Sequence, residues 1–492
     1  MPVPSLEPAR GDTGAGPTQP DPVPNRVIVI GAGVAGMSAA IEARAAGAQV
    51  VLLERDADTV GGAANQAALM LFSGSTEEAA AGIEDSPEQL LAEWPAITGG
   101  DVSDEWVQRF ANANIPEVHD WLAGLGLGWG PPVLDPSGGD TPRIHMISGG
   151  GAELVDVLHA QLPPEVIWMG VEALGLEQDA TGRVTGVQWR DVETDEVGTV
   201  RGRGVVVATG GFGWNLDRVR EARPDLEGVV LTRASWSGAD GNGLEMLTGL
   251  GAATQNLAAV GLYAHASRCP SDATVEMRVP FQFAVPWVDP AGQRFVDESA
   301  MNDLRTAEAV VDHQAAWMVF DTNTLTGAFT CDDGADARMS YTITDMVDDG
   351  FAARGDSLDA LGQTIDVDSS ALSASIEAYD RAVYAGEGDT FRSSVQNAQP
   401  VDEPPYFAMP VAVSVAKMFG GVDVDIRGRV LAVDGRVIPG LYAAGELTGM
   451  AGGSLVGDAG FTGSLSAVVL GGRVAGEHAA RDRIARYGGV LK

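Results

Sequence analysis

The residues with the clearest chemical potential lie between positions 31 and 54. Gly31, Gly33 and Gly36 form a Gly-x-Gly-x-x-Gly run between two apolar segments, and Glu54 ends the second segment. In this pattern the first glycine permits a tight turn, the second lets the backbone approach a pyrophosphate, and the third lets a helix pack on a strand. Amides at the helix start hold phosphates, while the acid accepts hydrogen bonds from ribose hydroxyls. The spacing predicts a dinucleotide-binding unit over 26–62.

Four further residues are candidates for acid–base or carbonyl-binding chemistry. Tyr263 and His265 lie in an apolar stretch, where they act as acid–base groups or carbonyl donors, or else are packed core residues. Lys417 is the only internal lysine. It is either a desolvated base or carbonyl donor, or a surface lysine at a strand edge. Arg305 is either a proton donor or a helix-surface ion-pair residue.

Several apolar segments are expected to position these residues. Short buried strands are expected at 27–30, 50–53, 165–169, 171–176, 183–189, 204–207 and 440–444, and a helix at about 463–483. Two of these strands end in glycine runs, at 208–211 and at 445. Bare backbone can approach a cofactor at both places. The fold class expected is α/β, a Rossmann-like domain with a mostly parallel sheet.

The composition changes over the middle of the chain. Between about 225 and 405, double glycines become rarer and mixed helix and loop patterns take over. We expect a disordered tail at 1–25, a nucleotide-binding domain at 26–225 and 404–485, and an inserted α+β capping domain at 226–403. Such an insertion creates an interdomain cleft, where small-molecule sites usually lie.

Charge and cysteine content narrow the class of partner. The 492 residues include 31 Lys or Arg and 68 Asp or Glu, a net charge of −37, which disfavours binding to nucleic acid or anionic lipid. No apolar stretch is long enough to span a bilayer, and no secretory signal is evident. Cys269 and Cys331 lack metal-binding spacing. A disulfide can form between them, but nothing in the sequence points to one. The expected location is therefore the cytoplasm.

The motifs together resemble those of one flavoprotein superfamily. They are the glycine run with Glu54, and the segments 60–62, 208–215, 237–243, 294–298, 439–446 and 471–476. In order and spacing the chain is similar to FAD-dependent fumarate reductases and 3-ketosteroid dehydrogenases over about 26–483. The resemblance implies bound FAD and hydride transfer between the flavin and the carbon beta to a carbonyl or carboxyl group.

The resemblance and the glycine run together assign a set of FAD-binding residues. We expect FAD to contact Gly31, Gly33, Ala35, Gly36, Glu54, Arg55, Gly61, Gly62, Ala63, Val171, Ala208, Thr209, Gly210, Gly445, Glu446, Ser464 and Leu465. In the family Glu446 lies near the ribityl chain, and the amides around Ser464 lie near the flavin pyrimidine. Since the stretch after the double glycine holds no histidine, the FAD is expected to be non-covalent. No metal is expected.

The chain departs from the fumarate reductase pattern at the residues that hold a dicarboxylate. His265 matches the first substrate histidine, but Asn302 stands in place of the proton-delivering arginine and Ala459 in place of a clamp arginine. Lys417 lies near the second histidine position. Because two carboxylates in a dry cleft need several cationic donors, a small dicarboxylate is a poor substrate candidate.

The 3-ketosteroid dehydrogenase pattern fits in part. A neutral ketone needs only one or two donors, which the glycine-rich run 451–460 can supply from its backbone. The tyrosine that is usual in that run is absent, and Ser454 is the nearest hydroxyl.

The function expected is that of an FAD-dependent oxidoreductase acting on CH–CH groups. The first hypothesis is an α,β-desaturase of a largely neutral, cyclic or other ketone. The second is a reductase of an unsaturated carboxylate, which needs Arg305 or Lys417 to bind the acid. The third is a flavin-binding partner protein without catalysis. Since no second Gly-x-Gly-x-x-Gly unit occurs, we expect the electron partner to be a quinone, oxygen or a protein carrier rather than NAD(P)H.

Overall fold

The chain folds into two compact units. The computed structural model describes residues 25–99, 104–135, 139–280, 285–298, 304–331, 339–391, 398–450, 455 and 460–482. Unit 1 comprises 1–212, 236–259 and 418–492, and unit 2 comprises 213–235 and 260–417. Unit 2 overlaps the predicted capping domain, whose boundaries stay a prediction. The predicted tail lies, apart from residue 25, outside the described residues.

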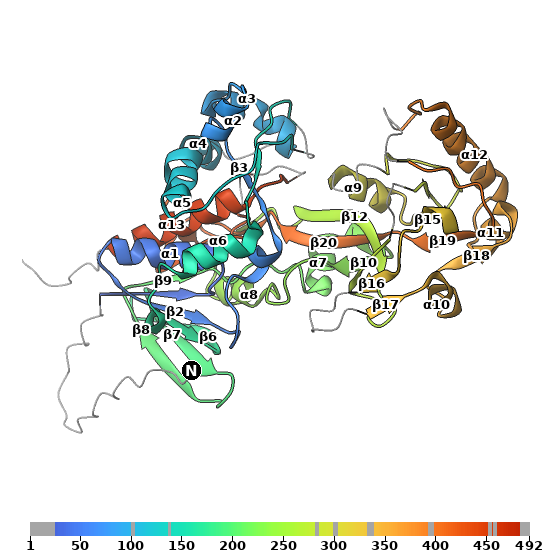
Figure 1. Cartoon of the computed structure of the whole chain (residues 1–492). Helices are drawn as coiled ribbons and strands as arrows, with labels where there is room; N and C mark the ends of the chain where they lie inside the picture. The colour runs from blue at the N-terminus through green and yellow to red at the C-terminus, as the bar shows by residue number, and fades with distance from the viewer. Residues whose placement is uncertain are drawn as a thin grey trace, which may run out of the picture. The chain divides into compact units, whose positions relative to one another are not determined.

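A six-stranded sheet forms the centre of unit 1 (Figure 1). Its order is β22-β23-β9-β1-β2-β5, and all neighbours pair in parallel except β22 with β23. The strands are β1 (Arg26–Ile30), β2 (Gln49–Glu54), β5 (Ile167–Met169), β9 (Gly204–Val207), β22 (Arg429–Leu431) and β23 (Val437–Ala443). Their apolar residues are buried because both faces of the sheet are covered.

Two long helices cover one face of this sheet. Figure 1 shows α1 (Val34–Ala45) and α13 (Leu465–Arg481) side by side. Their axes come close because α13 has glycine where α1 approaches. A Cβ at Gly472 would lie 2.3 Å from the carbonyl oxygen of Ala35, and one at Gly476 would lie 2.1 Å from that of Ala39. The antiparallel sheet β6 (Val171–Gln178), β7 (Val184–Asp191) and β8 (Val197–Arg201) packs on the other face.

Unit 1 contains further helices, turns and strands. They are α2 (Thr76–Ala80), α3 (Pro87–Thr98), α4 (Asp104–Ala113), the π-helix η2 (Asn114–His119), α5 (Asp120–Gly124), α6 (Gly150–His159) and α8 (Asn242–Thr248), the 3₁₀ turns η1 (Gly62–Gln66) and η3 (Pro164–Val166), and the strands β3 (Leu69–Leu71), β4 (Ile144–Met146), β11 (Thr254–Gln255) and β21 (Gly421–Val422). The predicted strand 165–169 was too long at its start. Pro164 opens a 3₁₀ turn there, so the strand begins only at Ile167.

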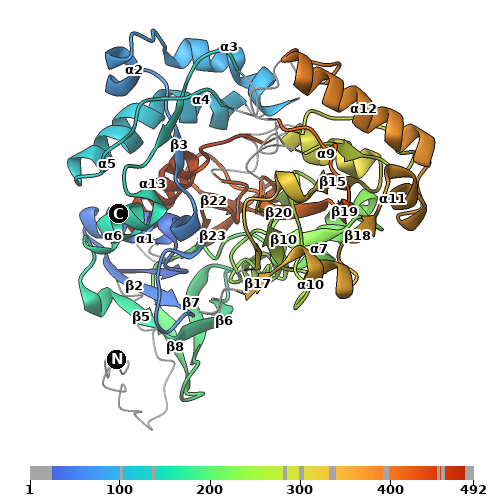
Figure 2. The same cartoon turned by 45° about the vertical axis from the view of Figure 1, so that its right-hand side comes forward.

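Unit 2 is built on two sheets. One has the order β10-β20-β12-β13-β16-β17 and the other β14-β15-β19-β18, and Figure 2 shows α11 and α12 beside the second. The strands are β10 (Leu231–Arg233), β12 (Val260–Arg268), β13 (Glu276–Arg278), β14 (Trp287–Val288), β15 (Trp317–Asp321), β16 (Phe329–Cys331), β17 (Met339–Tyr341), β18 (Ala353–Gly355), β19 (Tyr406–Pro410) and β20 (Ala412–Met418). The helices are α7 (Leu216–Ala222), α9 (Leu304–Asp312), α10 (Ile343–Asp348), α11 (Leu358–Thr364) and α12 (Ser369–Ala385), with the 3₁₀ turns η4 (Pro224–Leu226) and η5 (Thr322–Thr324).

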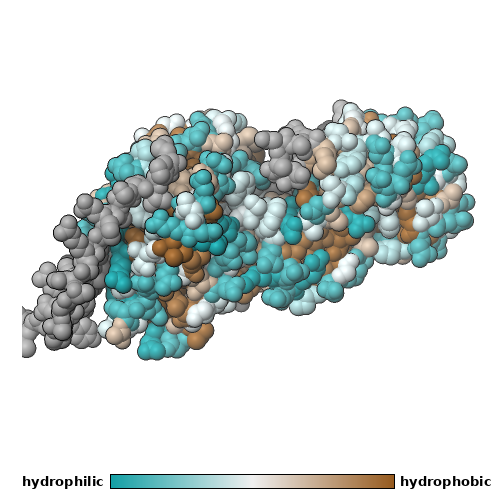
Figure 3. All heavy atoms as spheres, turned by 90° about the horizontal axis from the view of Figure 1, so that it is seen from below, coloured by the Kyte–Doolittle hydropathy of each residue, from teal (hydrophilic) through white to brown (hydrophobic). Residues whose placement is uncertain are grey.

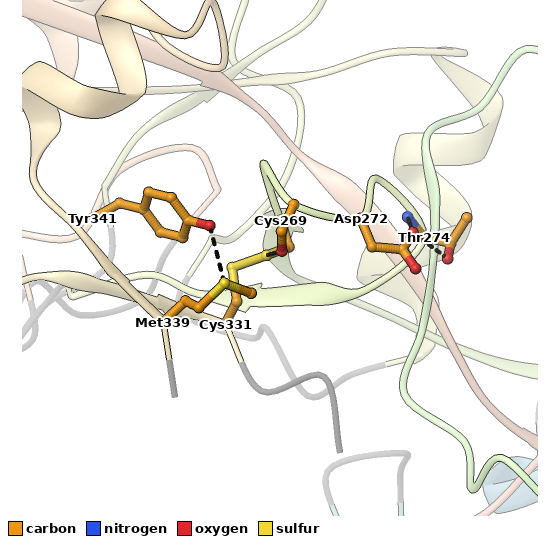
Figure 4. Close-up of a disulfide and its surroundings, with 7 residues drawn as sticks. Cys269, Asp272, Thr274, Cys331, Met339 and Tyr341 are labelled. Atoms are coloured by element: carbon orange, nitrogen blue, oxygen red, sulfur yellow. Dashed lines mark hydrogen bonds between the residues drawn. A yellow bond between two sulfur atoms is a disulfide. The ribbon is translucent and has the colours of Figure 1, made fainter. Parts of the chain in front are cut away.

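A disulfide joins two strands of the first sheet of unit 2. Cys269 directly follows β12 and Cys331 ends β16, and their Cα atoms lie 5.8 Å apart (Figure 4). Both cysteines are fully buried. Nearby, the hydroxyl of Tyr341 donates to the sulfur of Met339, and Thr274 is hydrogen bonded to Asp272. The pairing that the sequence left open therefore forms, and it ties β12 to the far side of its sheet.

The surface carries many hydrophilic residues. The face drawn in Figure 3 is mostly hydrophilic, with separate hydrophobic patches. Within the described ranges, no helix combines the length and the apolar character that crossing a bilayer requires.

Candidate functional site

The glycine run opens helix α1 at the carboxyl end of β1. The backbone N–H of Gly31 donates to the carbonyl of Leu53 on β2 at 2.8 Å, which fixes the start of the turn. Gly33 is the N-cap residue, no side chain caps the helix, and its first turn holds no acidic residue. The first amides of a helix lack intrahelical partners, so this helix start offers N–H groups and a positive dipole end to an anion.

Two of these glycines have no room for a side chain. A Cβ at Gly36 would lie 1.8 Å from the carbonyl oxygen of Gly31, and one at Gly31 would lie 2.5 Å from that of Ala208. Gly31 also has φ +96°, which other residues rarely adopt. The turn therefore needs glycine for its own geometry, and it leaves bare backbone on the side facing solvent.

Glu54 ends β2 beside this turn. Its Oε2 accepts a hydrogen bond from the backbone N–H of Ala32 at 2.7 Å, and its Oε1 accepts one from Asp56 at 2.9 Å. Burial raises the pKa of Glu54, while these two N–H donors oppose the rise. A partly buried carboxylate at this place suits the hydroxyls of a ribose.

Arg55 is paired with an acid that is distant from it in the sequence. Its Nη1 donates to Oδ2 of Asp240 at 2.7 Å. Burial alone would lower the pKa of Arg55, but the hydrogen bond to Asp240 raises it. The sequence alone does not reveal this partner, because the two residues are separated by 185 positions.

The double glycine Gly61–Gly62 lies alongside the first glycine run. The N–H of Gly61 donates to the carbonyl of Ala32 at 2.9 Å, and Gly61 forms a bridge with Gly33. Both glycines have positive φ, +98° and +54°, and η1 with Ala63 follows directly. Two bare backbone segments therefore run side by side here.

The other predicted cofactor residues follow β9 and β23, the next strands of the sheet. Gly210 and Gly211 follow β9 and lie against the carboxylate of Glu446. A Cβ at Gly211 would be 2.7 Å from its Oε1. The same Oε1 accepts a hydrogen bond from the N–H of Met418 at 2.9 Å. Thr209 directly precedes Gly210. Its Oγ1 is buried and makes no hydrogen bond within the described residues.

Helix α13 brings the last group to this edge. Ser464 is its N-cap, with no side-chain cap, and forms a bridge with Met70 of β3. Ala35 of α1 contacts both α13 and the turn at Gly445. A Cβ built on Gly445 would be 2.7 Å from the Cβ of Ala35. Val171 is buried at the start of β6, two residues beyond the strand that pairs with Glu54.

These observations fit an extended dinucleotide such as FAD. The carboxyl ends of parallel strands β23, β9, β1 and β2 meet at one edge, where ligands of open α/β sheets bind. That edge carries a free helix start, a ribose-suited carboxylate, glycine backbone and the orphaned hydroxyl of Thr209.

Comparison with known proteins decides the family. A model of the FAD binding domain matches residues 26–457. The chain belongs to this FAD-binding family. It is 30% identical to a fumarate reductase (cytochrome) of Shewanella frigidimarina over 92% of this chain and 77% of that protein. It is 28% identical to a KsdD-like steroid dehydrogenase of Mycobacterium tuberculosis over 92% of this chain and 95% of that protein.

A solved structure confirms the fold. The 3-ketosteroid Δ1-dehydrogenase of Sterolibacterium denitrificans matches with a TM-score of 0.75 at 19% identity, over 93% of this chain and all of that chain. The predicted α/β flavoprotein fold and the resemblance to fumarate reductases and ketosteroid dehydrogenases are confirmed. The chain is an FAD-dependent oxidoreductase acting on CH–CH groups. The residue-level assignments and the non-covalent attachment stay predictions.

The predicted catalytic residues all belong to unit 2. Tyr263 and His265 lie on β12, Lys417 lies on the neighbouring strand β20, and α9, which begins with Leu304 and Arg305, packs against β12. Tyr263 and Lys417 are half-buried and Arg305 is exposed. Glu308, a neighbour of Arg305 on α9, is paired with Arg223 at 2.8 Å.

Part of the predicted substrate site lies outside the described residues. This is so for Asn302, Ser454, Ala459, most of the run 451–460 and the side chain of His265. Leu455 within that run is described, and its carbonyl accepts a hydrogen bond from the indole of Trp94 at 2.7 Å. No sequence signal had pointed to Trp94 as an anchor for this run.

Proposed function

We propose that the protein is a flavin-dependent α,β-desaturase of a largely neutral carbonyl compound, such as a cyclic ketone. The observation that carries this is the loss of two clamp positions: by the resemblance, Asn302 and Ala459 stand where fumarate reductases carry arginine. A neutral ketone needs only hydrogen-bond donors, whereas two carboxylates leave charges that must be paired.

The residues of β12 and β20 provide the groups that this reaction needs. A base removes the proton from the α carbon, and hydrogen bonds to the carbonyl oxygen stabilise the negative charge that develops there; Tyr263, His265 and Lys417 are the candidates for these roles. When bound at the cofactor edge of unit 1, FAD would supply the hydride acceptor for the β hydrogen. The product is the α,β-unsaturated ketone, and the two electrons then pass to a quinone, oxygen or a protein carrier.

The second candidate function is reduction of an unsaturated monocarboxylate. It is supported by the 30% identity with a fumarate reductase and by two cations, Lys417 on β20 and Arg305 on the helix that packs against the neighbouring β12. In this case Lys417 or Arg305 holds the carboxylate.

The compartment is a further part of the proposal. Sequence analysis favoured the cytoplasm, but a buried disulfide such as Cys269–Cys331 is typical of proteins in oxidising compartments. We therefore propose an oxidising location. Alkylation of free thiols in cells lysed directly into denaturant, which exposes both buried cysteines, tests it: both are expected to be protected by the disulfide, and their labelling would support the cytoplasm.

Anaerobic mixing with two substrate panels distinguishes the candidate functions. Saturated cyclic ketones should bleach the oxidised flavin of a desaturase. Enoic acids should instead reoxidise the reduced flavin of a carboxylate reductase. Turnover of fumarate with no response to any ketone would overturn the first proposal.

A further inference from the structure

The turn 236–240 is part of unit 1 and lies against the double glycine of the cofactor edge. A Cβ built on Gly62 would be 3.8 Å from Cδ1 and 4.0 Å from Nε1 of the Trp236 indole. The same edge of the indole contacts Gly238, whose Cβ would be 3.1 Å from Cδ1. The pyrrole side of Trp236 therefore lies against its own turn and faces the backbone of Gly62.

An ion pair fastens this turn to the end of β2. Asp240 accepts the hydrogen bond from Arg55, the residue that follows Glu54. Its Oδ1 also accepts from the N–H of Asn242 at 3.0 Å, and the carbonyl of Trp236 accepts from Ala239 at 2.9 Å. Asp240 is thus fixed from both sides, which sets the position of the whole turn.

The indole has an unused donor. Trp236 is half-buried, and its N–H makes no hydrogen bond to any described residue. This N–H is therefore available to solvent or to a bound ligand. A Cβ built on Gly62 would be 4.0 Å from this Nε1. The N–H therefore lies beside the backbone that is predicted to follow the cofactor.

We propose that Trp236 is a cofactor-binding residue. Its ring covers the part of FAD that runs along Gly61–Gly62, and its N–H donates a hydrogen bond to an oxygen of that part. Asp240 is a positioning residue: through Arg55 it holds the turn that presents the indole. The physical gain is apolar cover plus one hydrogen bond in a site that otherwise offers mainly backbone donors.

Titration of the apoprotein with FAD, followed by flavin fluorescence, tests the role of the indole. Trp236→Ala is expected to weaken FAD binding by 10-fold or more, and Trp236→Phe, which keeps a ring but loses the N–H, by about 3- to 10-fold. Trp121→Phe is the matched control, because Trp121 is a half-buried tryptophan of unit 1 on α5. It should leave the affinity unchanged.

Two further readouts separate direct contact from a structural role. Bound FAD should quench less tryptophan emission in Trp236→Phe than in wild type, because the fluorescent indole next to the flavin nucleotide is absent. The midpoint of thermal unfolding of the apoprotein should stay within the error of wild type for Trp236→Phe. FAD affinity equal to wild type in both Trp236 variants, or a loss seen equally in Trp121→Phe, would overturn the proposal.

The positioning role of Asp240 has its own test. Asp240→Ala should weaken FAD binding about 3- to 10-fold, and Asp240→Glu should restore part of it because a carboxylate again reaches Arg55. When Asp240→Ala is already present, adding Trp236→Phe should cause no further loss of FAD affinity. Full additivity of Asp240→Ala and Trp236→Phe would contradict coupling between the two residues.

Discussion

The backbone N–H of Met418 donates a hydrogen bond of 2.9 Å to Oε1 of Glu446. Met418 directly follows Lys417, the candidate catalytic lysine, and Glu446 follows Gly445, two residues beyond the end of β23. One carboxylate therefore fixes the backbone next to a candidate catalytic residue and also lies against Gly211 at the cofactor edge.

Removal of this carboxylate should weaken FAD binding. Glu446→Ala leaves the Met418 N–H without its acceptor, and an unmet buried N–H costs about 1–3 kcal/mol. We expect a loss of FAD affinity of at least 5-fold, measured by equilibrium titration of the apoprotein. Glu446→Gln keeps a carbonyl oxygen for the same N–H and should lose less. Equal affinities in Glu446→Ala and wild type would argue against the assignment of Glu446 to the cofactor.

Substitution of the candidate catalytic residues should change flavin reduction without changing FAD binding. Lys417→Met keeps the length of the side chain and removes its charge, and His265→Ala removes the imidazole. Both are expected to slow anaerobic flavin reduction by a ketone about 10²-fold, the usual scale for a lost acid–base or oxyanion group. Stopped-flow absorbance of the flavin gives the rate, and FAD titration gives the control.

Arg305→Ala separates the two candidate functions. With a neutral ketone the rate and the KM should match wild type. With an unsaturated acid, loss of the cation should raise the KM if Arg305 holds the carboxylate.

Unchanged flavin reduction in both Lys417→Met and His265→Ala would show that the assignment of these two residues to catalysis is wrong.

Glu78 should make stability depend on pH. This side chain is 1% exposed at the start of α2, where its Oε2 accepts hydrogen bonds from Gly74 and Ser75 and its Oε1 is buried without a partner in the described residues. Burial raises its pKa from 4.5 to about 7. Between these two pH values the folded protein binds more protons than the unfolded chain, so stability falls as pH rises.

The matched variant is Glu78→Gln, which keeps a neutral side chain of the same shape. We expect the wild type to lose about 3 kcal/mol of unfolding free energy relative to this variant between pH 4.5 and pH 7. Denaturant unfolding of both proteins across this range measures the difference. A constant difference, or a wild type that gains stability as pH rises, would contradict the assignment.

The disulfide should stabilise unit 2 in particular. Cys269 and Cys331 are separated by 62 positions, and closing a loop of that size contributes about 4 kcal/mol in the chain-entropy model. The double Cys269→Ser, Cys331→Ser variant should show a lower calorimetric transition for unit 2. Its FAD affinity should be retained, since the predicted cofactor residues all lie in unit 1. Reductant should lower the wild-type transition and leave that of the variant unchanged.

The fold of unit 1 was predictable because its signals are local. The apolar run before Gly31 and the one before Glu54 each form a buried parallel strand, and the glycine spacing sets the turn. Likewise the acid after the last predicted strand, Glu446, lies at the same sheet edge. In each case a few consecutive residues determine the geometry.

The features that were missed depend on residues distant in sequence. Arg143 is buried and paired with Asp85, 58 positions away, and Arg55 is paired with Asp240. The segment 236–259 belongs to unit 1, although the chain on both sides of it belongs to unit 2. Such pairings arise only when the tertiary fold brings distant segments of the chain together, so one sequence without its relatives does not reveal them.

Binding of FAD at the glycine turn is the central claim, and titration of the apoprotein with FAD tests it most directly. Wild type should bind one FAD per chain. Gly36→Ala should lose this binding, because its Cβ would meet the carbonyl oxygen of Gly31 at 1.8 Å. Gly124→Ala is the matched control, since a Cβ there meets nothing within 4 Å, and it should bind FAD as wild type does. A wild-type protein that takes up no FAD, or a folded Gly36→Ala variant that binds it with wild-type affinity, would contradict the account.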